Sequence, residues 1–314
     1  MLCKPSNQAY SRFTLKMALE IAAPHTWPAA IIPTLIATCC AAATDRVVSV
    51  SASLVCLVIV ILMQSAVNTF NDYYDFVKGT DSESDNVDPS DAVLVYNNVN
   101  PKSALRLALG FLAVAFALGI YIIYRAGFIP LIIALIGALF VVVYSAGKTP
   151  ISYLPLGEFV SGFVMGGLIP LAVYMAITLR FDWLALLWSL PSIIGIGLIM
   201  FTNNTCDIER DTPAKRKTLS VLLGRDKARK LYHAAMYAMV VLIIAIVAAF
   251  FTSGLLVIPF MLLAGNSAFK ALKRNTLTQA TRMQAMPQVL TMNVLFGSFY
   301  AASILFGGFV TLVF

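Results

Sequence analysis

The stretch VVSVSASLVCLVIVILMQSAVNTFNDYYDFVKGTD, residues 47–81, decides the fold of this chain. A long apolar run begins near Val47 and ends in the segment NDYYD, residues 71–75. Acidic and amide side chains therefore stand where a helix is expected to leave a membrane. Ionisable groups at such a boundary are costly to bury, and they mark a functional site by default. We take this segment as the first of two polar clusters around which the chain is organised.

The second polar cluster lies much later in the chain and consists of Asn203, Asp207 and Asp211. Residues four apart share one face of a helix, as do Asn71 and Asp75 in the first cluster. Each cluster is therefore predicted to present a strip of oxygen ligands, and we expect the two strips to face each other. Facing carboxylates repel unless a cation lies between them, and oxygen ligands near solvent favour Mg²⁺, which also binds substrate phosphates.

The composition indicates a membrane protein. Of the 314 residues, 60% are hydrophobic and 12% are charged, whereas a soluble domain carries roughly twice that charged fraction. Apolar runs of about 20 residues recur, and each is long enough to cross a bilayer as a helix. A net charge of +7 can indicate a nucleic-acid partner, but none is expected here because the sequence shows no soluble domain to bind one. The membrane topology explains the charge better. The expected class is an all-α protein with the lipid bilayer as its surroundings.

The distribution of basic residues predicts the topology. If the N-terminus is cytoplasmic and there are nine spans, all Lys and Arg residues except Arg46, Arg125 and Arg180 lie on the cytoplasmic side. This is the positive-inside asymmetry that sets orientation, and it places the C-terminus outside. The predicted spans cover about residues 27–44, 47–71, 104–124, 127–146, 155–178, 183–205, 229–251, 254–272 and 287–312.

The remaining segments complete a single predicted domain over residues 1–314, with the nine helices around a central cavity. Residues 8–24 are amphipathic and are predicted to form an interfacial helix. The polar stretches 76–103 and 207–228 are predicted to be cytoplasmic cap loops, each following one cluster. With no organelle transit peptide evident, the expected location is a bacterial or archaeal plasma membrane, with the active site facing the cytoplasm.

Basic side chains at the cytoplasmic edges are candidates for binding a diphosphate, which carries more negative charge than metal ions alone neutralise. The candidates are Lys148, Arg210, Lys215 and Arg216. Topology alone also explains most basic residues, and polar residues at helix ends are often caps or solvated loop residues. Two acidic clusters at matching depth on one side favour a site over that alternative.

These residues resemble the UbiA-type intramembrane aromatic prenyltransferases, which have nine transmembrane helices and two Asp-rich motifs on the cytoplasmic side. The family motif N-D-x-x-D is similar to residues 71–75, and N-x-x-x-D-x-x-x-D is similar to residues 203–211. Many members carry a third aspartate where this chain has Gly79. With that glycine and the segment YSAGKTPISYLPLGE, residues 144–158, the chain most resembles the 1,4-dihydroxy-2-naphthoate polyprenyltransferases of menaquinone synthesis.

The chain departs from that branch at three positions. Cys206 and Thr212 stand where the branch often has Arg, and Asp91 stands near a commonly basic position. The departures bear on the identity of the acceptor, and they leave the metal-binding carboxylates untouched.

The resemblance implies Mg²⁺-dependent transfer of a polyprenyl group from an allylic diphosphate to 1,4-dihydroxy-2-naphthoate, with loss of CO₂ and diphosphate. It implies that Asn71, Asp75, Asp207 and Asp211 are catalytic. It implies two Mg²⁺ ions, held by Asn71, Asp72, Asp75, Asp81, Asn203, Asp207 and Asp211. Substrate contacts are expected from Lys148, Arg210, Lys215, Arg216, Tyr144, Tyr153 and Glu158. The tyrosines are candidates to shelter an allylic cation or to anchor the interface, and Glu158 is a candidate to position the acceptor.

Two alternatives stay open at this point. The same chemistry could act on another aromatic acceptor, a tetrapyrrole or a glycerol phosphate. A cation-coupled transporter also uses intramembrane aspartates, although transporters tend to place them near the bilayer midplane. The sequence leaves the prenyl chain length and the oligomeric state undetermined.

Overall fold

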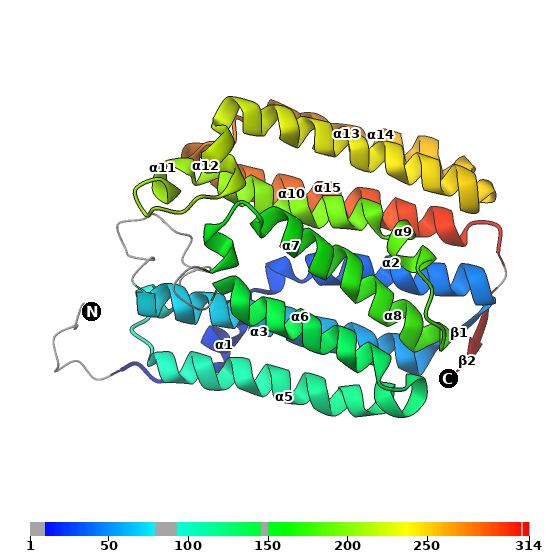
Figure 1. Ribbon diagram of the computed structural model, residues 1–314, viewed down its shortest axis with the longest axis horizontal. Helices are drawn as coiled ribbons and strands as arrows, with labels where there is room; N and C mark the ends of the chain where they lie inside the picture. Colours follow the sequence, from blue (N-terminus) through cyan, green and yellow to red (C-terminus); the bar gives the residue numbers. More distant parts are fainter. Residues whose placement is uncertain (1–9, 79–92, 146–149, 309, 314) are drawn as a thin grey trace. The chain divides into compact units, whose positions relative to one another are not determined.

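A computed structural model of the chain describes residues 10–78, 93–145, 150–308 and 310–313; within its helices, the side chains of Asp75, Lys78, Val141 and Ser145 are not described. The chain divides into two compact units. One comprises Met1–Trp27 and Val58–Ile120, and the other comprises Pro28–Leu57 and Tyr121–Phe314. The prediction of a single domain stays a prediction. Figure 1 follows the path of the chain through its helices.

The first unit holds α1 (Leu15–Ala22), most of α3 (Val50–Lys78), α4 (Val93–Tyr96) and most of α5 (Pro101–Ala126). A short 3₁₀ helix, η1 (Pro24–Thr26), joins α1 to the chain that follows. The prediction of one helix over 8–24 is wrong in extent, since only Leu15–Ala22 is α-helical. Before it, the Ser11 amide bonds to the carbonyl of Asn98 at 3.1 Å, and the Thr14 hydroxyl caps the helix.

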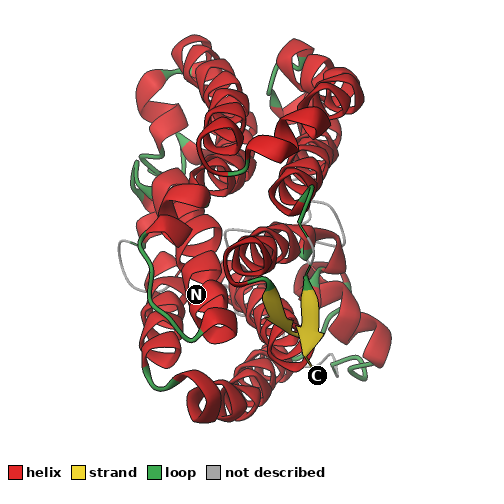
Figure 2. Ribbon diagram, turned by 90° about the vertical axis from the view of Figure 1, so that its right-hand side faces the viewer, coloured by secondary structure: helices red, strands yellow, loops and turns green. Residues whose placement is uncertain are grey.

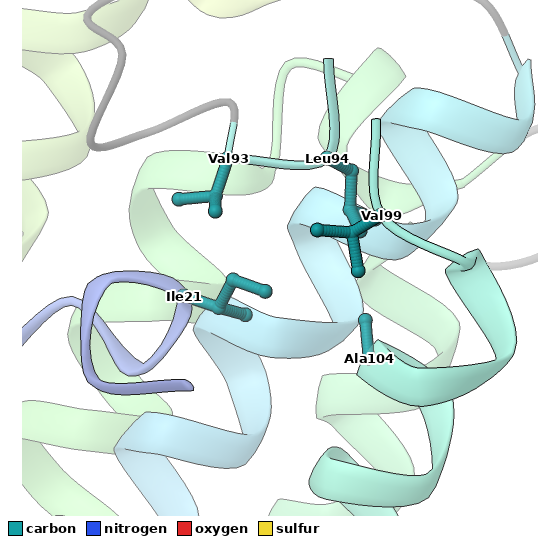
Figure 3. Packing of buried hydrophobic residues seen from close by; sticks show 5 residues of the cluster. All are labelled: Ile21, Val93, Leu94, Val99 and Ala104. Carbon is teal, nitrogen blue, oxygen red and sulfur yellow. The ribbon is translucent and has the colours of Figure 1, made fainter. Parts of the chain in front are cut away.

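A small apolar core holds this unit together. Figure 3 shows its buried residues: Ile21, Val93, Leu94, Val99 and Ala104. The predicted polar loop 76–103 is therefore wrong at both ends, because α3 runs on to Lys78 and α5 begins at Pro101. Between them, Val93 and Leu94 of α4 are buried in the core, which draws this part of the segment inward. Residues 79–92 lie outside the described part of the chain.

The second unit is a larger helical bundle. Its helices, beside the start of α3 and the end of α5, are α2 (Pro28–Asp45), α6 (Ile129–Ser145), α7 (Gly157–Phe163), α8 (Ile169–Thr178), α9 (Leu184–Trp188), α10 (Leu190–Cys206), α11 (Ile208–Asp211), α12 (Leu219–Leu223), α13 (Arg225–Phe250), α14 (Ile258–Arg274) and α15 (Arg282–Leu305). Short 3₁₀ helices are η3 (Ile151–Tyr153), η5 (Thr252–Val257) and η6 (Gln279–Thr281), and η4 (Val164–Leu168) is a π-helix. Helix α10 packs against α7, α13 and α15, which places the end of α10 inside the bundle.

Seven helical stretches in the described part of the chain are long and apolar enough to cross a membrane. Two shorter apolar helices, Ile129–Tyr144 and Leu190–Cys206, coincide with two further predicted spans. The protein is therefore a helical membrane protein, while the count of nine spans and the orientation of the termini stay predictions.

The last predicted span, 287–312, is wrong at both ends. Helix α15 begins at Arg282 and ends at Leu305, after which the chain turns through Gly307, whose φ is 78°. It then forms strand β2 (Thr311–Val313), which pairs in parallel with β1 (Val47–Ser49). Figure 2 shows these two strands in yellow beside the helices, which are red. The all-α prediction thus misses one short sheet, since three-residue strands leave no periodic signal.

Glycines bring α7 and η4 into backbone contact with α10. A Cβ on Gly162 would lie 2.5 Å from the carbonyl oxygen of Ile193, and one on Gly166 would lie 2.6 Å from the Ile193 Cα. Neither space admits a methyl group without moving a backbone. Small residues at helix interfaces allow close approach of this kind in membranes.

Replacing Gly166 by alanine is expected to destabilise the protein by about 1–3 kcal/mol, because the new methyl group must push α10 away. Thermal unfolding of the purified protein in detergent, followed by circular dichroism, measures the effect. Gly110 in α5 is the matched control, since a Cβ there meets nothing within 4 Å. The same change at Gly110 should stabilise the helix by about 0.5–1 kcal/mol. Equal melting shifts for the two variants would contradict the packing argument.

Candidate active site

The second polar cluster is built at the end of α10. This helix ends at Cys206, Asp207 stands between two helices, and α11 follows at once. The Asp207 amide bonds to the carbonyl of Asn203 at 3.1 Å, and the Asp211 amide bonds to the carbonyl of Asp207 at 2.8 Å. Hydrogen bonding from residue i+4 to residue i thus continues across the junction. The three residues therefore follow one another at about one helical turn each, as the sequence predicts.

Both carboxylates of this cluster are buried, Asp207 at 6% exposure and Asp211 at 1%. Burial raises the pKa of the Asp211 carboxyl to about 6, and the nearby Arg216 guanidinium opposes that rise. Holding two charged carboxylates here is costly without a cation close by. The site is therefore prepared for positive charge.

Arg216, a predicted diphosphate contact, lies beside Asp211. Its Nη1 is 3.1 Å from Asp211 Oδ1, and its Nη2 donates to the carbonyl of Ser152 at 3.3 Å. The guanidinium also lies over the ring of Tyr153, 5.1 Å from the centroid. The structure thus brings together three residues that the sequence singled out separately: Asp211, Arg216 and Tyr153.

Arg282, the first residue of α15, is a site residue that the sequence reasoning missed. Its Nη2 donates to Asn203 Oδ1 at 2.8 Å, and its Nε is 3.4 Å from Asp207 Oδ1. In the sequence, Arg282 bears only on the predicted topology. Its position as a single basic residue opening the last apolar run was the available signal, but nothing in the sequence connects it to Asn203.

The other two basic candidates that the structure describes in this unit lie around α11. Arg210 is half-buried within α11, and Lys215 is exposed on the turn that follows, at φ 58°. Arg225 fixes this region, because its Nη2 reaches both oxygens of Glu209 at 2.7 Å and its Nη1 donates to the carbonyl of Thr205 at 3.0 Å. The end of α10 and the start of α11 are therefore held in place by one arginine.

A second polar group lies inside the bundle and includes two predicted substrate contacts. Glu158 is 7% exposed in α7, and its Oε1 accepts a hydrogen bond from Asn204 Nδ2 at 2.8 Å. The hydroxyl of Tyr144 lies against the neighbouring Gly157, 3.2 Å from where a Cβ would be. The sequence analysis gave no role to Asn204, although it directly follows Asn203.

The first polar cluster lies on α3, in the other unit. Asn71 and Asp72 belong to the last two turns of α3, and Asp72 is 7% exposed. The cluster is inside the helix rather than at its end, because no helix breaker occurs before Gly79. The side chain of Asp75 lies outside the described residues, as do Asp81 and Lys148. That the two clusters face each other stays a prediction.

The donor set fits magnesium. Within the described residues, no group of three or more His, Cys, Asp or Glu side chains is placed to hold a metal ion. Mg²⁺ needs no such protein cage, since it binds through one or two carboxylates, water and substrate phosphates. Asp207 and Asp211, with the amide oxygen of Asn203, provide hard oxygen donors of that kind.

Comparison with known proteins decides the family. The model of the UbiA prenyltransferase family matches residues 30–297. The chain belongs to the UbiA prenyltransferase family. The predicted resemblance is confirmed, and the match takes in both polar clusters, Arg216 and Arg282.

Relatives within the family differ in how much of their length is matched. A 1,4-dihydroxy-2-naphthoate octaprenyltransferase of Bacillus subtilis is 34% identical over 67% of this chain and 66% of its own length. The chain thus spans slightly less than two thirds of that relative. UbiA prenyltransferase domain-containing protein 1 of Xenopus tropicalis is 28% identical over 93% of this chain and 83% of its own length.

The fold agrees with solved structures of the family. A UbiA homologue from Archaeoglobus fulgidus, solved with DMAPP and Mg²⁺ bound, matches with a TM-score of 0.59. The match covers 92% of this chain and 99% of that one at 15% sequence identity. At this identity the likeness establishes the UbiA fold.

Proposed function

We propose that this protein transfers a polyprenyl group from an allylic diphosphate to 1,4-dihydroxy-2-naphthoate, releasing CO₂ and diphosphate and giving demethylmenaquinone in its reduced, hydroquinone form. The observation that carries the proposal is that Asp207 and Asp211, in line with Asn203, are buried and that each carboxylate has an arginine beside it. Membership of the UbiA prenyltransferase family and the 34% identical naphthoate octaprenyltransferase of Bacillus subtilis support it.

The leaving group explains why acidic and basic side chains lie together in this site. Mg²⁺ held by Asp207, Asp211 and Asn203 would neutralise negative charge on the diphosphate as the C–O bond breaks, and two ions are proposed in all. Arg216 supplies further fixed positive charge from the side of Asp211. The proposed metal ligands in the first cluster are Asn71, Asp72, Asp75 and Asp81. Lys148, Arg210 and Lys215 are proposed as additional diphosphate contacts.

Arg282 is proposed as a positioning residue. It donates a hydrogen bond to the side-chain oxygen of Asn203 and lies beside the carboxylate of Asp207, so it orients two of the proposed ligands. Its charge also offsets a buried carboxylate before any metal binds, which lowers the cost of keeping the site preformed.

The acceptor and the allylic cation make different demands. The ring must approach the first carbon of the prenyl chain while water is excluded, which requires a site enclosed by apolar side chains. Tyr153, fixed by the Arg216 guanidinium, and Tyr144 are proposed to face the cation with their rings. Family membership argues against the transporter alternative, and the active site is proposed to face the cytoplasm in a plasma membrane.

The direct test is product formation by the purified protein in detergent. Incubation with 1,4-dihydroxy-2-naphthoate, a polyprenyl diphosphate and Mg²⁺ should give the hydroquinone form of demethylmenaquinone, identified by mass spectrometry directly or as the quinone after oxidation in air. Removing Mg²⁺ with EDTA should stop the reaction, and adding Mg²⁺ in excess should restore it. Product from homogentisate, a chlorophyllide or a glycerol phosphate, with none from the naphthoate, would replace the proposed acceptor. Turnover at an undiminished rate in EDTA would contradict the metal assignment.

A further inference from the structure

We infer that Glu158 and Asn204 form the recognition pair for a phenolic hydroxyl of the acceptor, with Glu158 Oε2 accepting a hydrogen bond from that hydroxyl. The inference rests on the proposed function and goes beyond it, because it assigns the group that orients the acceptor ring. Both residues lie in the same unit of the structure, in α7 and α10.

The evidence begins with an unsatisfied oxygen. Asn204, 3% exposed, donates to Oε1 of Glu158, whereas Oε2 is buried and has no hydrogen-bond partner among the described residues. Buried polar atoms are almost always paired, and one left unpaired is costly. A carboxylate held by one oxygen, with the other free, is the arrangement expected of a site that awaits a donor from a ligand.

The main chain that carries this carboxylate is closely packed. The carbonyl oxygen of Glu158 lies 3.2 Å from where a Cβ on Gly197 would be, so α7 and α10 touch at this level. The closer contacts of Gly162 and Gly166 with Ile193 continue the same interface. Helix α7 then passes into the π-helix η4, and π-helical segments inside helices occur frequently at functional sites. The backbone of Glu158 is therefore fixed against α10, and the hydrogen bond from Asn204 holds one oxygen of its carboxylate.

The location suits an acceptor next to the leaving group. Asn204 follows Asn203, a proposed ligand of the metal and diphosphate site, and neighbouring Cα atoms are about 3.8 Å apart. Adjacent residues on a helix point about 100° apart. Asn203 thus serves the diphosphate while Asn204 serves the acceptor, so that the two substrates meet at one turn of α10.

The chemistry selects the donor. A single free carboxylate oxygen without further ligands does not make a cation site, because a divalent ion requires more oxygen donors. A phenolic O–H supplies one strong hydrogen bond to it. That bond also raises electron density on the ring, which favours attack by the ring carbon on an allylic cation. The acceptor's own carboxylate would be repelled by Glu158, so the ring is oriented with a hydroxyl toward α7.

The experiment compares 1,4-dihydroxy-2-naphthoate with its two monomethyl ethers, each tested with one polyprenyl diphosphate and Mg²⁺. In the wild-type protein, blocking the recognised hydroxyl should lower kcat/KM for the acceptor by about 10²-fold or more. The other ether should be affected much less. Glu158→Gln keeps an oxygen for Asn204 and places an NH₂ group where the acceptor donates. This variant should raise the acceptor KM about tenfold, lose most of the discrimination between the ethers, and leave the KM for the prenyl diphosphate nearly unchanged.

Ser161→Ala is the matched control in the same helix, since its hydroxyl donates to the main-chain carbonyl of Glu158, at 3.2 Å, and not to the carboxylate. This control should behave as the wild type. Equal use of both ethers by the wild-type protein would overturn the inference while leaving the prenyl transfer established. An equal change in KM for both substrates in Glu158→Gln would also overturn it, since that result indicates a structural role. Absence of turnover with every phenolic acceptor would overturn the proposed function and the inference together.

Discussion

Replacing Asp207 by asparagine is expected to lower kcat by about 10³-fold or more while leaving the protein folded in detergent. The asparagine matches the aspartate in size but carries no charge, so a buried oxygen ligand of Mg²⁺–diphosphate loses its electrostatic attraction. Charge stabilisation of this kind is worth several kcal/mol in the transition state, and each 1.4 kcal/mol is about tenfold in rate. Product formation under saturating substrates measures the loss, and thermal unfolding confirms that the fold is intact. The same loss is expected for Asp75→Asn in the first cluster.

Asp226→Asn is the control for that experiment. Asp226 lies in the first turn of α13 and is exposed, so the same chemical change there should leave kcat within about twofold, as surface substitutions usually do. Full activity in both Asp207→Asn and Asp75→Asn would refute the metal-site assignment. Loss of activity in all three variants would instead indicate that removing any negative charge, and not a metal ligand in particular, impairs the enzyme.

Replacing Arg282 by glutamine is expected to raise the KM for the prenyl diphosphate and to lower the Mg²⁺ concentration needed for half-maximal activity. The KM for the prenyl diphosphate should rise and kcat/KM should fall by about 10²-fold, because Asn203 and Asp207 lose the cation that orients them. The Mg²⁺ concentration for half-maximal activity should fall, because Asp207 then carries an uncompensated negative charge. Arg282→Lys, which keeps the charge but not the two-pronged contact, should lie between glutamine and wild type.

Opposite shifts distinguish positioning from simple damage, since a disordered site would bind both magnesium and substrate more weakly. Arg274, exposed at the end of α14, is the matched control, and Arg274→Gln should leave both constants unchanged. A rise in the Mg²⁺ requirement of Arg282→Gln would show that the arginine acts by supporting the fold rather than by offsetting the charge of Asp207.

Much of the fold was predictable because membrane insertion depends on local properties. Long apolar runs and helical spacing can be counted along the chain. Predicted spans coincide with the seven long apolar helices of the described residues and with the two shorter ones. The errors occur where a polar or mixed segment has a partner elsewhere. Ser11 pairs with Asn98, the apolar turn of α4 enters a core, and β2 finds β1 across most of the chain.

The same division holds for the site. Sequence alone determined the membrane class, the two polar motifs and the resemblance to a family, because these depend on composition and on spacings of four residues. Only the tertiary structure decided that Arg282 meets Asn203, that Arg216 joins Asp211 to Tyr153, and that Glu158 is paired with Asn204. These contacts join residues on different helices, and their geometry is set by how closely the helices pack. Spacing along the chain carries no record of that packing.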